Sequence, residues 1–138
     1  MEKAPNFRLP QIQSNTFYQL EDFLGKAVIL TFWTSWCPDC QKDLPKKEHL
    51  YQTLNTEKVE MITINVAGRE RYSEDAVDFY QSHLRELTLV DNGIETYSNF
   101  KAQGVPTTVI INKEGFITNR FGDKSEFLEI VEAIGKVI

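Results

Sequence analysis

Apolar residues gather in short runs between polar, glycine-containing stretches, a pattern typical of alternating strands and helices. The longest run, Ala27–Trp33, is apolar on both faces and has the length of a strand. It therefore predicts a central strand that is covered on each side. Val59–Val66 predicts a second buried strand, and Leu87–Val90 predicts a short third one. No run approaches the roughly 20 apolar residues that cross a bilayer.

Helical spacing appears between and after these strands. A first helix is expected from the cysteine pair to about Leu54, with a kink at Pro45 because proline removes a backbone donor. A second helix is expected to have Ser73 as its N-cap, and a short one should cover Gly93–Lys101. The last helix carries an apolar stripe formed by Phe127, Ile130, Val131, Ile134, Val137 and Ile138.

The C-terminal half also contains a predicted hairpin, formed by Thr107–Asn112 and Phe116–Phe121. Pro5–Ser14 is expected to be an irregular extended segment, and Thr16–Leu20 a short edge strand. Strands and helices that alternate before a hairpin predict an α/β fold, a three-layer sandwich with a mixed sheet and helices on both faces. No repeat or flexible linker interrupts the pattern, so a single domain is expected over 1–138.

Composition excludes several classes of protein. The chain of 138 residues has 15 Lys and Arg against 20 Asp and Glu, a net charge of −5, which argues against nucleic-acid binding. Hydrophobic residues make up 41%, the proportion of an ordinary globular protein and not of a disordered one. The polar N-terminus contains no signal peptide, which fits either a cytosolic protein or a chain whose anchor has been removed.

The two cysteines, Cys37 and Cys40, stand at C-x-x-C spacing where a helix should follow a buried strand. Free N–H groups and the helix dipole stabilise a thiolate at the first position, while a thiol one turn inside should be buried and protonated. The pair therefore predicts one attacking and one resolving thiol. Core cysteines, a structural disulfide and half of a metal site stay open as alternatives. A metal site would need further ligands, and the only histidines are His49, too far along its helix, and His83.

Two motifs resemble the thioredoxin superfamily. Phe32–Cys40 (FWTSWCPDC) resembles its active-site segment, and Gly104–Thr108 (GVPTT) resembles its cis-proline loop. Ala4–Leu9 and Leu24–Lys26 resemble the TlpA/ResA-like branch, whose members are thiol-disulfide oxidoreductases that are often anchored outside the cytoplasmic membrane. The resemblance implies a thioredoxin-like fold and a redox-active Cys37–Cys40 disulfide that needs no further cofactor.

The resemblance also assigns roles to single residues. It implies that Cys37 is the exposed nucleophile and that Cys40 is the resolving thiol. Pro106 would be cis and packed against the sulfurs, and the Val105 backbone would pair with an extended substrate chain. Trp36 would cover the site and offer an apolar docking surface.

Some positions depart from the superfamily pattern. Thr31 stands where thioredoxin has a buried aspartate, and it cannot take up a proton. Glu70 is the candidate for a proton relay, or else a solvated loop acid. Between the cysteines lie Pro38 and Asp39. Asp39 should destabilise a neighbouring thiolate and favour a reductant or mild exchanger with a potential of about −250 mV, unless it points to water and is screened.

Two other functions stay open beside a thiol-disulfide oxidoreductase. Thr34 stands three residues before Cys37, as in peroxiredoxin-like enzymes, but Leu30 occupies the place where they need proline. A non-catalytic module that binds metal or protein is the other alternative. The preferred function acts on protein disulfides, requires an electron donor, and uses neither metal nor nucleic acid. The protein is expected to be a monomer. A location outside the cytoplasm, anchored through a segment absent from this chain, is preferred to a cytoplasmic one.

Overall fold

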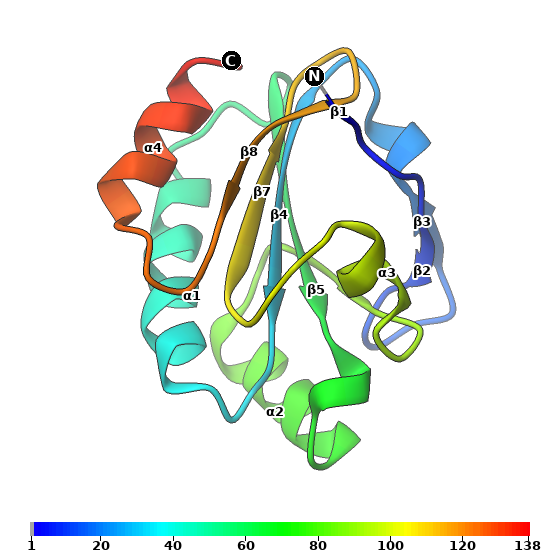
Figure 1. The fold of residues 1–138 in the computed structure, drawn as a ribbon. Coiled ribbons are helices and arrows are strands. Elements are labelled where there is room, and N and C mark those ends of the chain that lie inside the picture. Colours follow the sequence, from blue (N-terminus) through cyan, green and yellow to red (C-terminus); the bar gives the residue numbers. More distant parts are fainter. Residues whose placement is uncertain (1) are drawn as a thin grey trace.

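The computed structural model describes residues 2–138, and a β-sheet lies at its centre (Figure 1). The strands are Glu2–Lys3 (β1), Arg8–Pro10 (β2), Phe17–Gln19 (β3), Ala27–Trp33 (β4), Val59–Asn65 (β5), Leu87–Val90 (β6), Thr107–Ile111 (β7) and Phe116–Phe121 (β8). Six of them form one sheet in the order β1-β8-β7-β4-β5-β6, while β2 and β3 pair separately. Because β4 is parallel to β5 and antiparallel to β7, the sheet is mixed, as predicted.

Helices cover this sheet on both faces (Figure 1). They are Pro38–Tyr51 (α1), Ser73–His83 (α2), Glu95–Asn99 (α3) and Phe127–Gly135 (α4), with 3-10 turns at Leu20–Phe23 (η1) and Ala67–Arg69 (η2). The β4–α1–β5 and β5–α2–β6 connections cross the sheet in one direction, so right-handed crossovers place α1 and α2 on one face. α4 joins them there, while α3 and the segment with β2 and β3 cover the other face. The predicted three-layer sandwich is thereby confirmed.

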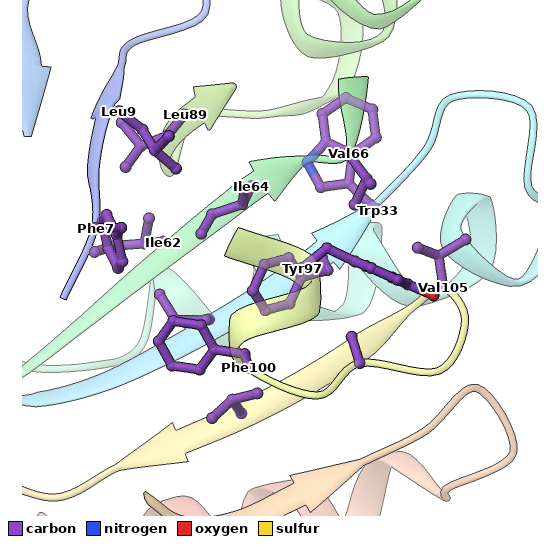
Figure 2. Close-up of a cluster of buried hydrophobic side chains, with 14 of the residues drawn as sticks. Phe7, Leu9, Trp33, Ile62, Ile64, Val66, Leu89, Tyr97, Phe100 and Val105 are labelled. Atoms are coloured by element: carbon purple, nitrogen blue, oxygen red, sulfur yellow. The ribbon is translucent and has the colours of Figure 1, made fainter. Parts of the chain in front are cut away.

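Buried side chains pack on both faces of the sheet, because successive strand residues point to opposite sides. On the α1 and α4 side, Ile29 of β4 packs with Ile134 of α4. On the opposite side, the Phe32 ring lies 6.2 Å from the Tyr97 ring and 5.8 Å from the Phe100 ring. Figure 2 shows the larger cluster of buried side chains, which includes these rings and in which the N-terminal segment, the sheet and α3 meet. The central strand is thus buried over its whole length, as its composition predicted.

The N-terminal segment is more ordered than the sequence predicted. The stretch 5–14 was expected to be irregular, but it contains β2, which pairs with β3. The strand predicted at 16–20 is shorter and belongs to this small sheet rather than to an edge of the main one. β1 pairs with β8, more than 100 residues away, at Glu2 opposite Ile117. Local periodicity contains no information about such distant partners, which explains why the sequence did not predict these N-terminal strands.

Three predicted helix ends were also wrong. α1 ends at Tyr51 instead of Leu54, because the chain then closes into turns in which the Leu54 amide bonds the Tyr51 carbonyl. Ser73 is the first helical residue and not the N-cap, since Tyr72 takes the extended N-cap conformation. Ile138, counted in the apolar stripe of the last helix, lies beyond α4 and is exposed. α1 continues through Pro45, and the kink there stays a prediction.

The short third helix differs from its prediction. The helix expected over 93–101 is confined to α3, because Gly93 and Lys101 both take positive φ values that an α-helix does not contain. Within the described residues 2–138, no helix is long and apolar enough to cross a membrane.

Candidate active site

Cys37 stands where β4 has ended and α1 begins. It is the N-cap of α1, and its sulfur accepts a hydrogen bond from the Cys40 amide at 3.4 Å. Pro38 follows at the first helical position, where proline is favoured because its missing N–H would be unpaired in any case. The strand-to-helix placement predicted for the cysteine pair is therefore present, and the first sulfur faces the unpaired amides of the helix.

The loop before β7 approaches the same sulfur from across the fold. The Cys37 thiol donates a hydrogen bond to the Val105 carbonyl at 3.5 Å, which joins residues 68 positions apart. The Val105–Pro106 peptide bond is cis, the isomer that the motif predicted. The two sequence motifs thus meet at one site, while packing of Pro106 directly on the sulfurs stays a prediction.

Both sulfurs are buried, which corrects one expectation. Cys37 was expected to be an exposed nucleophile, but only 6% of its surface is exposed, because the helix amides and the Val105 loop enclose it. Cys40 is fully buried, and both thiols are free. Burial is the main cause that raises the pKa of the Cys40 thiol far above its ordinary value. The thiol of the second cysteine is therefore protonated at neutral pH and unreactive, as predicted.

Trp36 and the dipeptide between the cysteines form the exposed part of the site. Trp36 is 39% exposed, and its indole nitrogen donates to the Arg69 carbonyl at 2.8 Å. The Arg71 guanidinium lies 5.6 Å from the centre of the Trp36 ring, within the range of a cation–π contact. Pro38 and Asp39 are both exposed. An aromatic surface is thus available beside the cysteine pair.

Glu70 holds the loop that leads to Cys37. One carboxylate oxygen accepts from the Ser35 amide at 2.7 Å and from the Asn65 side chain at 2.7 Å. The other accepts from the Ser35 hydroxyl at 2.6 Å. Glu70 lies next to η2, and these bonds tie that turn to the end of β5 and to the loop after β4. Sequence reasoning named Glu70 but missed Ser35 and Asn65, which local patterns could not associate with it.

The metal alternative has no support in this arrangement. Within residues 2–138, no group of three or more His, Cys, Asp and Glu side chains could hold a metal ion. His49 and His83 are both exposed, and His83 packs its ring 4.7 Å from that of Phe79.

Comparisons with known proteins agree with this site. The chain is 32% identical over 116 residues to thiol-disulfide oxidoreductase ResA of Halalkalibacterium halodurans, covering 84% of this chain and 64% of that protein. It is 25% identical to the pneumococcal exposed lipoprotein thioredoxin of Streptococcus pneumoniae, with a TM-score of 0.82 over 96% of this chain and 99% of that one. The thioredoxin domain of a thiol-disulfide oxidoreductase from Bacteroides vulgatus shares the fold, with a TM-score of 0.84, 18% identity, and coverage of 99% and 96%.

A thioredoxin-like sheet, a C-x-x-C pair at a helix N-terminus and a cis-proline loop facing it define a class, the thiol-disulfide oxidoreductases. This chain is an enzyme domain of that class. More narrowly, the AhpC/TSA family matches residues 1–120, and the chain belongs to that family. The fold class and the resemblance to the thioredoxin superfamily, both inferred from the sequence, are confirmed.

Proposed function

We propose that this domain reduces or exchanges disulfides in protein substrates, with Cys37 as the nucleophile and Cys40 as the resolving thiol. One observation carries the proposal: the Cys37 sulfur lies between the N-terminal amides of α1 and the carbonyl that precedes the cis-proline. Amides at a helix N-terminus stabilise a thiolate, and the thiolate is the form that attacks a disulfide.

The exchange has two steps. The Cys37 thiolate attacks one substrate sulfur, the substrate disulfide breaks, and a mixed disulfide forms while the leaving cysteine takes up a proton. The Cys40 thiol then loses its proton, attacks the Cys37 sulfur and releases the second substrate cysteine as a thiolate. The substrate gains two electrons, and the domain leaves as a Cys37–Cys40 disulfide. An electron donor must reduce this disulfide before the next cycle.

Substrate chains would dock beside the cis-proline. An extended peptide could pair with the backbone at Val105, which the cis-proline loop presents next to Cys37. Trp36 would supply an apolar surface for residues that flank the substrate cysteine, since it is exposed and fixed by its bond to Arg69. Glu70 would fix the loop that presents Trp36 and Cys37, and a role in proton transfer stays a prediction.

Asp39 would favour the reducing direction of the exchange. Its exposed carboxylate lies between the cysteines in sequence and opposes negative charge on the attacking sulfur. A less stable thiolate makes the disulfide harder to reduce, so we expect a reductant or mild exchanger with a potential of about −250 mV.

The relatives support a cellular location and a set of partners for this domain. The pneumococcal neighbour is described as an exposed lipoprotein, which supports a place for this domain outside the cytoplasmic membrane. There it would act as a monomer on protein disulfides and would receive electrons from a donor protein. No cofactor beyond the cysteine pair is expected.

The function is tested by insulin reduction and by trapping. The unmodified domain should reduce insulin disulfides with dithiothreitol as the donor, and Cys37→Ser should lose this activity. Cys40→Ser should form mixed disulfides that persist on non-reducing gels and disappear with reductant. Insulin reduction by Cys37→Ser would contradict the scheme, and rapid peroxide consumption without disulfide reduction would favour the peroxidase alternative.

A further inference from the structure

Lys47 is a buried lysine that takes no part in the two exchange steps described above. It lies in the middle of α1, and its side chain is fully buried. The ammonium group donates to the Thr108 hydroxyl and lies 2.7 Å from an Asp43 carboxylate oxygen. Burying an ammonium group is costly, so it persists only where partners of this kind compensate for the lost water. The cost raises the question of what the buried charge does.

The partner of Lys47 lies close to the resolving cysteine. Asp43 follows Cys40 by three residues on α1, and residues at that spacing are neighbours on a helix surface. Asp43 also lines a groove of about 140 Å³ together with Asp39 and Pro106. The groove is large enough for a few water molecules. The buried ion pair therefore extends from the active-site groove to the strand that follows the cis-proline.

The charge of Asp43 acts against the resolving step. Cys40 can attack only as a thiolate, yet burial and the nearby Asp43 carboxylate both raise the pKa of its thiol. An anion that stays uncompensated beside a buried thiol would oppose its ionisation strongly, because charges interact more in a medium of low polarity. Lys47 is the cation that directly contacts Asp43.

We propose that Lys47 is a positioning residue for the resolving step: it neutralises and fixes Asp43, so that Cys40 can become a thiolate in the mixed disulfide. The proposal rests on the proposed exchange function. In the step concerned, the Cys40 proton passes to water, its thiolate bonds to the Cys37 sulfur, and the substrate sulfur leaves with the electron pair of the broken disulfide.

Two further acidic residues lie near this ion pair. Asp43 and Glu48 belong to α1, and Glu48 accepts from the backbone amides of Arg85 and Glu86. Glu86, in the turn before β6, interacts electrostatically with both Lys47 and Asp43. Loss of Lys47 would therefore leave Asp43 beside Cys40 without its cation, which predicts a slower resolving step that recovers as the pH rises.

The two steps can be separated with dithiobis-nitrobenzoate, a chromogenic disulfide. Attack by Cys37 releases a first coloured thiolate, and resolution by Cys40 releases a second. In Lys47→Met the second rate constant should fall about 10-fold at neutral pH and its pH profile should shift upward, while the first changes less than about two-fold. Lys58→Met is the matched control, because that exposed lysine precedes β5 at the opposite end of the sheet.

Two further variants decide how Lys47 acts. Asp43→Asn should leave resolution as fast as in the unmodified domain or faster, and Asp43→Asn/Lys47→Met should be faster than Lys47→Met alone. Asp43→Asn keeps the side chain's shape and provides the test if Lys47→Met does not fold. Resolution at the normal rate in folded Lys47→Met, or slow resolution in Asp43→Asn, overturns the proposal. Failure of the proposed function would differ, since the unmodified domain would then not reduce insulin.

Discussion

Two glutamates, Glu70 and Glu86, contrast in how their carboxylates are held. Glu70 lies beside the active-site loop and accepts three hydrogen bonds from Ser35 and Asn65. Glu86 is 1% exposed, and no N–H or hydroxyl donor among the described residues 2–138 bonds its carboxylate oxygens. Burial, followed by the neighbouring Glu48, raises the pKa of Glu86 to about 9.

The difference separates two uses of a carboxylic acid. A carboxylate that is surrounded by donors works as an anchor, because each bond fixes a neighbouring group and offsets the loss of water. A buried acid without donors stays protonated at neutral pH, and its O–H can donate a hydrogen bond to a neighbouring carboxylate such as that of Glu48. Glu70 therefore fixes the geometry of the site, while Glu86 makes the stability of the domain depend on pH.

The largest expected effect concerns Glu86. The folded state keeps its proton up to a pKa of about 9, whereas the unfolded chain releases it above the ordinary value of 4.5. The stabilisation is therefore complete below pH 4.5 and is lost as the pH rises towards 9. Glu86→Gln cannot ionise and should be more stable than the unmodified domain at pH 8, by on the order of 3 kcal/mol.

Urea unfolding at pH 5 and pH 8 measures this difference. The free energy of unfolding should fall with pH in the unmodified domain and much less in Glu86→Gln. Glu57→Gln, which changes an exposed glutamate in the same way, should leave the pH dependence unaltered. Equal pH slopes for Glu86→Gln and the unmodified domain would show that Glu86 is ionised in the folded state.

A somewhat smaller effect is expected at Glu70. Glu70→Ala removes the acceptor of three hydrogen bonds and should lower the free energy of unfolding by about 2 kcal/mol. It should also slow the attack by Cys37, because the loop that precedes the cysteine loses its support. Ser35→Ala is the matched comparison, since it removes only the hydroxyl bond and should cost about 1 kcal/mol.

Glu70→Gln distinguishes an anchor from a proton relay. The amide keeps the shape of the side chain and one acceptor oxygen, but it cannot transfer a proton at neutral pH. If Glu70 only anchors the loop, the pH profile of both exchange steps should be unchanged in shape. A profile that loses a titration in Glu70→Gln would establish the relay instead.

The smallest effect is expected at Asp39, whose carboxylate is exposed. Asp39→His replaces an exposed anion near the attacking sulfur and should raise the reduction potential by about 30 mV or less. Equilibration with glutathione or thioredoxin measures the shift. A potential above about −180 mV for the unmodified domain would contradict the assignment as a reductant.

Some features of the site were predictable because they are local in the chain. The C-x-x-C spacing after Ala27–Trp33 predicted a cysteine pair at a helix N-terminus, and the resemblance of Gly104–Thr108 to the cis-proline loop of the thioredoxin superfamily implied a cis-proline; the structure shows both. The burial of Lys47 was not predictable, because a lysine on a helix is normally exposed and nothing in the sequence shows that Thr108 faces it.

The sequence by itself determined the elements and the chemistry. Alternating apolar runs specify most strands and helices through contacts a few residues long, and two cysteines at C-x-x-C spacing before a helix indicate a redox pair. The tertiary structure decided which distant groups meet: Val105 on the Cys37 sulfur, Ser35 and Asn65 on Glu70, and Asp43 and Thr108 on Lys47. These contacts depend on strand order and helix packing. Burial at these contacts then changes the charge and the reactivity of the residues.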